Sequence, residues 1–271
     1  MRNLLITLSC IFVMVVFSLF SESSEMHAAD IVSSRYPLEA ASVEKKNTIS
    51  DKLNKASDFK FPSRTVKNGG AVLNPWKGSK LVVIDPGHGG DDPGANSGKI
   101  LEKDINLDVA LRLETLLKSY NIPTYITRND DRFIELYDRI KAANERNAAL
   151  FVSIHCNWFK YEHLNGVMTL YFPSENLRAG FLCELDYAKL LQSELAKSLG
   201  TKDLGIEDRT DLAVLRHANM PTALVELGFL SNYKEAKLLA SGDFKQKAAE
   251  GIAEGIRKSL IKMTVYKGKK E

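Results

Sequence analysis

The stretch LVVIDPGHGG, residues 81–90, is the part of the sequence that indicates the fold class most clearly. Its first four residues are apolar and mostly β-branched, and Asp85-Pro86-Gly87 then stops the run. This pattern is typical of a buried strand that ends in a loop. Apolar residues recur at helical spacing over residues 102–120, which predicts a helix after that loop. The stretch therefore predicts the first strand–loop–helix unit of an α/β domain.

The same alternation continues toward the C-terminus. Further strands are expected at residues 124–127, 150–154, 167–172 and 222–225, and further helices at 136–143, 186–199 and 244–260. Strands that alternate with helices predict an α/β fold with a mostly parallel sheet and helices on both faces. No segment repeats at intervals of 20–50 residues, so a repeat architecture is excluded. In such folds the chemistry gathers at the carboxyl ends of the strands.

The composition narrows the class of protein. Hydrophobic residues make up 44% of the 271 residues and charged residues 26%, which is typical of a soluble globular protein. There are 37 Lys and Arg against 34 Asp and Glu, so the net charge is +3, too small to favour a nucleic-acid partner. Three cysteines exclude a disulfide framework and provide no CxxC pair for a structural zinc site.

The N-terminal part reads as a targeting segment. Arg2 precedes residues 3–21, which carry no charge, so residues 1–29 form either a cleaved signal peptide or a retained membrane anchor. Residues 30–75 are polar, and a linker or stalk is expected there. Residues 265–271 form a basic tail. A cleaved signal peptide and a retained anchor would both direct the protein out of the cytoplasm. The sequence therefore predicts action outside the cytoplasm, with membrane contact only through the N-terminal segment.

Four side chains that handle metals or protons fall at one edge of the predicted sheet. His88 follows the first strand, His155 ends the strand at 150–154, Glu226 ends the strand at 222–225, and Glu102 begins the first helix. Two imidazoles, one carboxylate and an open position form the usual ligand set of a catalytic zinc ion. The remaining carboxylate can carry a proton from water to a leaving group. The placement predicts a hydrolytic metal site.

Each of these residues also has an ordinary structural explanation. A lone histidine in a glycine-rich loop is commonly a turn residue, and a glutamate at a helix start favours the helix dipole. Glu226 is harder to explain in this way, because Val225 and Leu227 flank it and its carboxylate must leave water. The joint placement of all four at one edge favours a site over separate structural roles. No HExxH motif is present, so the common metalloprotease helix is absent.

Three segments resemble the zinc-dependent N-acetylmuramoyl-L-alanine amidases. They are LVVIDPGHGGDDPGANSGKILE (81–102), FVSIHCN (151–157) and PTALVELGFLSN (221–232). The resemblance covers about residues 76–262 and implies a single catalytic domain, residues 76–264, with a six-stranded sheet. It also implies one Zn²⁺ held by His88, Glu102 and His155, with Glu226 as the catalytic carboxylate. The implied substrate is peptidoglycan, cut between the lactyl group of N-acetylmuramic acid and L-alanine.

Residues beside the expected ligands yield further predictions. Asn157 is a candidate for substrate binding, or else it caps the end of its strand. Cys156 replaces the alanine that usually follows His155, and strand alternation directs it away from the metal, so a small buried hydrophobe is expected. Trp158 is a second departure from the family pattern. Arg128 either contacts peptide carboxylates or locks a loop through an ion pair.

The compact layout most resembles the spore-cortex, germination-specific amidases. A vegetative or mother-cell-lysis autolysin with the same chemistry is an alternative, as are a zinc peptidase that cuts between peptide residues and a non-catalytic wall-binding scaffold. Residues 157–167 are too few to hold the inserted helix that plugs the active site of division amidases. Any restraint on activity must therefore come from a regulatory partner protein, the compartment or the substrate.

Overall fold

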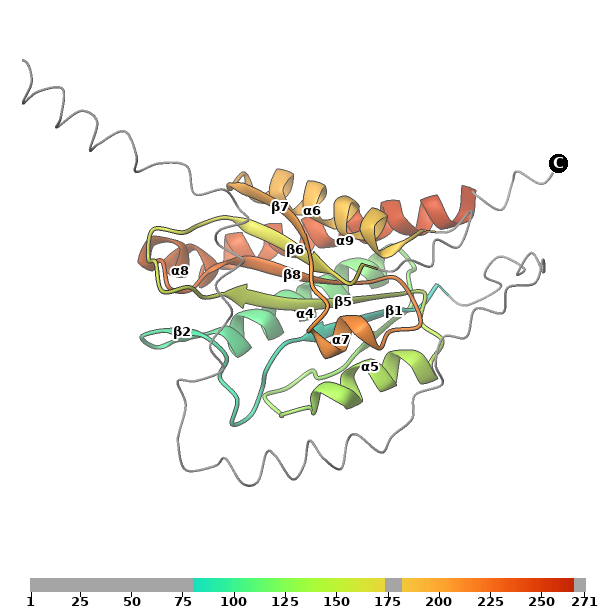
Figure 1. The fold of residues 1–271 in the computed structure, drawn as a ribbon, viewed down its shortest axis with the longest axis horizontal. Coiled ribbons are helices and arrows are strands. Elements are labelled where there is room, and N and C mark those ends of the chain that lie inside the picture. The colour runs from blue at the N-terminus through green and yellow to red at the C-terminus, as the bar shows by residue number, and fades with distance from the viewer. Residues whose placement is uncertain (1–79, 174–181, 266–271) are drawn as a thin grey trace, which may run out of the picture. The chain divides into compact units, whose positions relative to one another are not determined.

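The computed structural model describes residues 80–173 and 182–265, and these residues form one α/β domain. The predicted N-terminal segments, the start of the predicted domain at residue 76 and the basic tail lie outside the described residues. Figure 1 shows a central sheet with helices on both sides. Within the described part of the chain, no helix is both long and apolar enough to cross a membrane.

The main sheet has six strands in the order β4-β1-β5-β8-β6-β7, and a two-stranded ribbon lies beside it. Strands β4, β1, β5 and β8 run parallel, whereas β6 is antiparallel to β8 and parallel to β7. The prediction of a six-stranded, mostly parallel sheet is confirmed. The strands of the main sheet are β1 (Val82–Pro86), β4 (Thr124–Ile126), β5 (Leu150–Asn157), β6 (Val167–Tyr171), β7 (Asp203–Asp208) and β8 (Thr222–Phe229), and the ribbon consists of β2 (Asn96–Ser97) and β3 (Ile100–Leu101).

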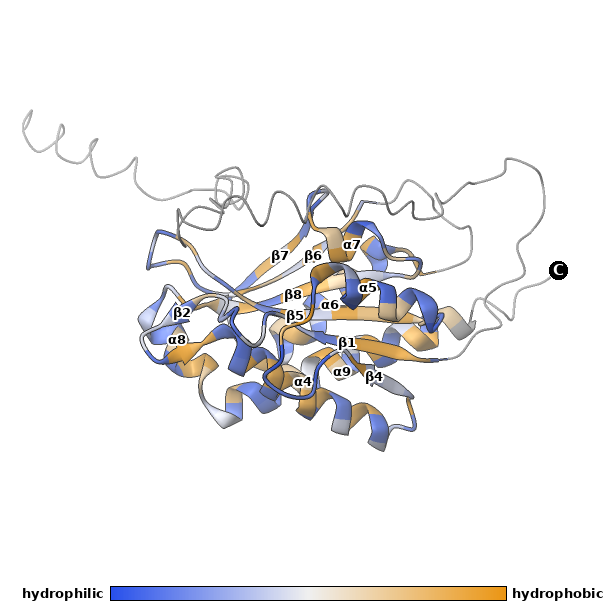
Figure 2. Cartoon of the chain, turned by 90° about the horizontal axis from the view of Figure 1, so that it is seen from below, coloured by the Kyte–Doolittle hydropathy of each residue, from blue (hydrophilic) through white to orange (hydrophobic). Residues whose placement is uncertain are grey.

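Helices cover the two faces of the sheet unequally. Helices α4, α6 and α9 pack on one face around a large hydrophobic cluster, and α5 and the short α7 pack on the other face around a smaller one. Figure 2 shows hydrophobic central strands between helices that alternate hydrophobic and hydrophilic residues. The helices are α4 (Glu102–Ser119), α5 (Leu136–Glu145), α6 (Glu184–Leu199), α7 (Ala213–Arg216), α8 (Tyr233–Leu239) and α9 (Gly242–Val265).

Strand alternation sorts side chains between these two faces. Ile154 and Val225 belong to the larger cluster, whereas Phe151 and Leu224 belong to the smaller one. His155 and Glu226 follow Ile154 and Val225 directly, so they lie on the face of α5 and α7.

The sequence patterns missed five elements and shortened two strands. The two-residue strands β2 and β3 lie in the glycine-rich segment that was expected to be a loop. Strand β7 was not predicted because its residues, DLGIED, are polar and no more than half-buried at the edge of the sheet. The short helices α7 and α8 were also missed. Strands β5 and β8 continue past His155 and Glu226, so neither residue ends its strand as predicted. Asn157 pairs with Phe229 after a bulge, and this pairing lengthens both strands.

Candidate active site

The loop after β1 holds His88 in an unusual backbone conformation. His88 has φ +61°, in the left-handed region that few non-glycine residues adopt. A Cβ atom at Gly87 would lie 2.2 Å from the His155 ring, and one at Gly94 would lie 2.5 Å from Oε2 of Glu102. The glycines at these two positions therefore let the loop approach the other two predicted ligands closely.

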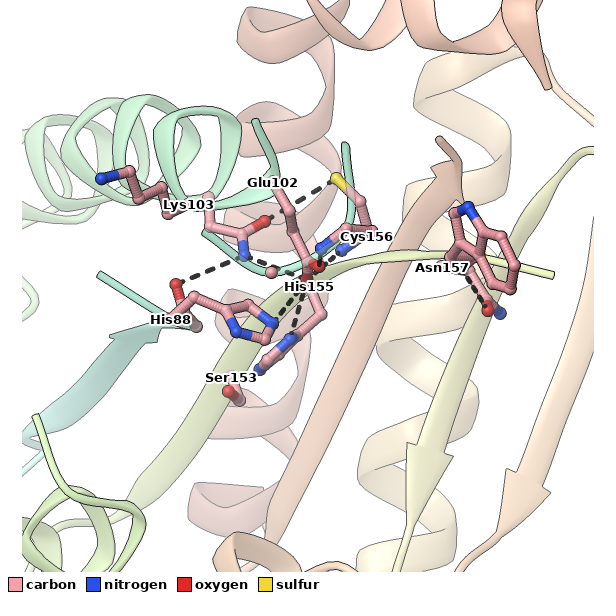
Figure 3. Close-up of polar contacts among 12 residues, drawn as sticks. His88, Glu102, Lys103, Ser153, His155, Cys156 and Asn157 are labelled. Atoms are coloured by element: carbon pink, nitrogen blue, oxygen red, sulfur yellow. Dashed lines mark hydrogen bonds and ion pairs between the residues drawn. The ribbon is translucent and has the colours of Figure 1, made fainter. Parts of the chain in front are cut away.

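Glu102 joins the two histidines. Its Oε1 atom lies 3.1 Å from Nε2 of His88 and 3.0 Å from Nδ1 of His155. The two imidazole rings meet edge to face with their centroids 4.9 Å apart. Figure 3 shows these three side chains converging from the β1 loop, the start of α4 and β5. Three of the four predicted site residues are thus in mutual contact at the carboxyl ends of the strands.

The other atoms of this cluster are held by further hydrogen bonds. Nδ1 of His88 lies 2.8 Å from Oδ2 of Asp92, which orients the ring so that Nε2 faces Glu102. Oε2 of Glu102 accepts a hydrogen bond from the backbone N–H of Ala95, and Oε1 accepts one from the N–H of Cys156. Sequence reasoning missed Asp92, although its position four residues after His88 in the same loop was a usable signal.

Hydrogen bonds and neighbouring charges shift the pKa values of His88 and Glu102 in opposite directions. Burial alone would lower the pKa of His88, but hydrogen bonds to Asp92 and Glu102, together with their charges, raise this pKa to about 10. Burial alone would raise the pKa of Glu102, but hydrogen bonds from His155 and His88 hold it well below its ordinary value. The Glu102 carboxylate is therefore ionised between the two imidazoles.

The three donor atoms fit a divalent cation. Among the described residues, His88, Glu102 and His155 are the group whose ligand atoms all lie within 4.8 Å of one another. Ligands bound about 2.1 Å from a tetrahedral zinc ion stand about 3.4 Å apart, so small movements would bring these atoms into place. The set of two nitrogens and one oxygen is one that zinc accepts, and it leaves a fourth position open.

Glu226 lies beside this cluster on the neighbouring strand. Glu226 pairs in register with His155 across β5 and β8 and is buried. Its Oε2 atom has no hydrogen-bond partner among the residues that the structure describes. Burial, followed by the negative charge of Glu102, raises the pKa of Glu226 to about 8. A buried carboxyl with a pKa near neutrality can both accept and donate a proton.

Two buried arginines hold the His88 loop from behind. The Arg139 guanidinium pairs with Asp85 at 2.9 Å and also donates to the carbonyls of Pro86 and His88. The Arg128 guanidinium donates to the carbonyls of Pro86 and Gly87. Arg128 thus locks a loop as one alternative predicted, but through carbonyl oxygens rather than an ion pair. Asp85 and Arg139 were missed as parts of this support.

Two neighbours of His155 have different surroundings. Cys156 is buried in the larger hydrophobic cluster on the opposite face from His155, as predicted. Burial, aided by the charge of Glu102, raises the pKa of its thiol well above the ordinary value. Oδ1 of Asn157 accepts a hydrogen bond from the N–H of Trp158, which is the capping contact (Figure 3). Substrate binding by Asn157 stays a prediction.

Lys103 also supports the loop around His88. Its Nζ donates to the carbonyl of Gly90 at 2.8 Å and pairs with Asp131 at 2.7 Å. Lys103 lies in the first turn of α4. Its contacts tie that turn to the glycine-rich loop and to the segment after β4.

The fold and the cluster together define a class of protein, an α/β enzyme with a candidate metal site at its sheet edge. Residues 82–258 match the Amidase_3 family model, described as N-acetylmuramoyl-L-alanine amidase. The chain therefore belongs to the N-acetylmuramoyl-L-alanine amidase family, whose members act on peptidoglycan.

Individual relatives agree with this assignment. The chain is similar to the catalytic domain of CwlV from Bacillus (Paenibacillus) polymyxa var. colistinus, with 38% identity, a TM-score of 0.62, and coverage of 67% of this chain and 98% of that one. It is 32% identical to the germination-specific amidase of Bacillus subtilis, over 67% of this chain and 81% of the relative. The CwlD amidase of Clostridioides difficile, solved in complex with the GerS lipoprotein, is 34% identical with a TM-score of 0.60, and the match covers 68% of this chain and 99% of CwlD.

Proposed function

We propose that the chain hydrolyses the amide between N-acetylmuramic acid and L-alanine in peptidoglycan with one zinc ion. His88, Glu102 and His155 would hold the ion through Nε2, Oε1 and Nδ1. The observation that carries this proposal is the meeting of these three atoms beside a buried glutamate. When bound, zinc acts as a Lewis acid toward water and toward the lactyl carbonyl.

Glu226 is the proposed proton carrier. Its carboxylate takes a proton from the attacking water, whose oxygen forms the new bond to the lactyl carbonyl carbon. The same carboxyl then gives that proton to the alanine nitrogen as the amide C–N bond breaks. The products are a free lactyl carboxylate on the sugar and a peptide with a free N-terminal alanine. The pKa of about 8 suits a group that must do both steps.

Metal removal tests the zinc proposal. A chelator should abolish release of N-terminal alanine from peptidoglycan, and added zinc should restore it.

Two variants separate metal binding from proton transfer. Glu226→Gln should bind one zinc ion per chain but lose about 10³-fold or more in kcat. His155→Ala should lose zinc and activity together. Activity in a protein shown to be metal-free would contradict the proposal.

We further propose that the chain acts outside the cytoplasm on the spore cortex. The similarity to a germination-specific amidase supports this role, and residues 1–29 would supply the export signal or anchor, followed by a linker over residues 30–75. Mass spectrometry of the muropeptides released from cortex and from vegetative wall tests it. Preferred release from cortex is expected, and equal or preferred release from vegetative wall would favour the autolysin alternative.

A regulatory partner protein is also part of the proposal. It rests on the similarity to CwlD, which was solved with the GerS lipoprotein. Full activity of the isolated chain on purified cortex would contradict a required partner.

A further inference from the structure

The loop between β5 and β6 carries four rings in six residues, Trp158 to His163. The rings of Phe159 and Tyr161 lie 5.4 Å apart between centroids, and those of Tyr161 and His163 lie 5.8 Å apart and stacked. Trp158 is 46% exposed and Tyr161 is 41% exposed. We call residues 158–163 the aromatic loop. Exposed aromatic side chains that gather in this way generally mark a binding surface.

The aromatic loop begins close to the reaction centre. Trp158 follows the last residue of β5 and comes three residues after His155, and three residues of extended chain span about 10 Å. The N–H of Phe159 donates to Oγ of Ser231, which follows the end of β8. The aromatic loop is thus joined to both strands that carry the proposed chemistry, β5 with His155 and β8 with Glu226.

Hydrogen bonds hold the loop in shape. Besides the bond between the Trp158 N–H and Asn157, the N–H of Leu164 donates to the carbonyl of Tyr161. Nδ2 of Asn232 donates to the carbonyl of Leu164 and so ties the far end of the loop to the start of α8. Rings on a loop held in this way lose little further freedom when a ligand binds.

The side chains of the aromatic loop suit the binding of a sugar. A sugar ring presents C–H groups on its face, which pack against aromatic rings, while its hydroxyls stay in water. The loop offers the exposed rings of Trp158 and Tyr161 for such packing. Polar groups lie beside them, since Nζ of Lys160 is 5.0 Å from the centre of the Tyr161 ring and Glu162 is exposed. In the proposed reaction a short ether link separates the muramic acid ring from the lactyl carbonyl, so the glycan must lie next to the reaction centre.

We propose that the exposed rings of Trp158 and Tyr161 in the aromatic loop contact sugar rings of the peptidoglycan glycan strand and so form a binding platform for it. This inference rests on the proposed amidase function and adds a glycan subsite to it. Three observations carry the argument: the exposure of the two rings, the hydrogen bonds that anchor the loop, and its attachment to the ends of β5 and β8. The platform would bind the polymer rather than take part in the chemical step.

Fluorescence tests the platform without any hydrolysis. The chain has two tryptophans, Trp76 and Trp158, so Trp76→Phe leaves Trp158 as the one tryptophan reporter in the full chain. Titration of this zinc-loaded variant with glycan strands freed of peptide should shift and change Trp158 emission to saturation. Adding Tyr161→Ala should weaken that binding about five- to tenfold. An emission spectrum that does not respond to the glycan would overturn the platform.

Kinetics on polymeric peptidoglycan provide the second readout. Trp158→Ala should raise KM about five- to tenfold and leave kcat within about twofold, and Trp158→Phe should restore most of the affinity. Tyr120→Ala is the matched control, because Tyr120 is 48% exposed and follows the C-terminal end of α4, about 27 Å from Glu102. It should change neither constant.

The outcomes separate this inference from the amidase proposal. Normal hydrolysis with an unchanged KM in Trp158→Ala would overturn the platform alone. Saturable glycan binding by a chain that releases no alanine would support the platform and contradict the amidase function. Loss of binding to another protein in Trp158→Ala, with an unchanged KM, would assign the loop to a protein partner and also overturn the platform.

Discussion

At the scale of single residues, the site depends on a few close approaches that tolerate no extra atoms. Gly87 faces the His155 ring so closely that a Cβ would lie 2.2–2.7 Å from its atoms. His155 in turn contacts Glu102, whose ionised oxygen also contacts His88. Displacing one ring therefore disturbs the whole ligand set.

Gly87→Ala tests this close approach. The new methyl group must push the His155 imidazole away, so zinc affinity should fall about 10- to 100-fold. Competition with a chromophoric chelator measures the affinity. Gly242→Ala, at the start of α9, is the control, because a Cβ there meets nothing within 4 Å. Unchanged zinc binding by Gly87→Ala would show that His155 is not held as a ligand.

The buried carboxyl of Glu226 predicts a pH effect on the metal-free protein. Its pKa is about 8 in the folded chain against an ordinary value of 4.5, so the folded state holds a proton that the unfolded state releases between these values. The free energy of unfolding should therefore fall as the pH rises from about 4.5 to about 8, and Glu226→Gln should make that fall shallower. Denaturant unfolding at several pH values, with chelator present, measures it. If the free energy of unfolding depended on pH in the same way in Glu226→Gln and in the unaltered chain, the pKa of Glu226 would not be raised in the folded state.

At the scale of elements, the loop after β1 is held by one arginine on α5 and one in the segment after β4. Arg139 on α5 and Arg128 after β4 donate to successive carbonyls of the segment from Pro86 to His88. Both guanidinium groups are buried, and Asp85 supplies the opposite charge. A planar fork of donors can bind several carbonyls at once, which a lysine ammonium on a flexible stem cannot do.

Arg139→Lys tests this support. The charge beside Asp85 is kept, but the fork that holds Pro86 and His88 is lost, so zinc affinity should fall about tenfold or more. The d–d spectrum of the cobalt-substituted protein should also change, because the geometry of His88 changes. Arg146→Lys, at the exposed end of α5, should alter neither. If Arg139→Lys binds zinc and cobalt like the unaltered chain, the arginine serves only stability.

At the scale of the whole molecule, the sheet brings together ligands that lie far apart in the chain. Adjacent β1, β5 and β8 place the His88 loop, His155 and Glu226 side by side, and α4 adds Glu102 at the same edge. Helices α4, α6 and α9 bury one face of the sheet, whereas the shorter α5 and α7 cover the other face, on which His155 and Glu226 lie. A metal bound at this edge would link several elements and stabilise them together.

Zinc should therefore raise the thermal stability of the domain. At a free zinc concentration of about 100 times Kd, the gain is about 2.7 kcal/mol, or roughly 5–10 °C in Tm for a domain of this size. Differential scanning calorimetry with and without zinc measures the shift. His155→Ala should lose it, and an equal shift in that variant would place the ion elsewhere.

The sequence by itself determined the α/β alternation, the sheet edge at which the chemistry gathers, and the four residues to examine there. These features follow from local patterns of apolar residues, glycine and proline, which a strand or helix imposes over a few neighbours. The burial of Cys156 in the core was likewise predicted from strand alternation alone.

Only the tertiary structure decided that Glu102 contacts both histidines through one oxygen, that Asp92 orients His88, and that two arginines hold the loop. The tertiary structure also revealed the polar edge strand β7 and the bulge after which β5 and β8 continue beyond His155 and Glu226. These features depend on strand order, register and packing between segments distant in the chain. Local sequence patterns do not determine which distant segments come into contact, because those contacts depend on how the whole chain packs.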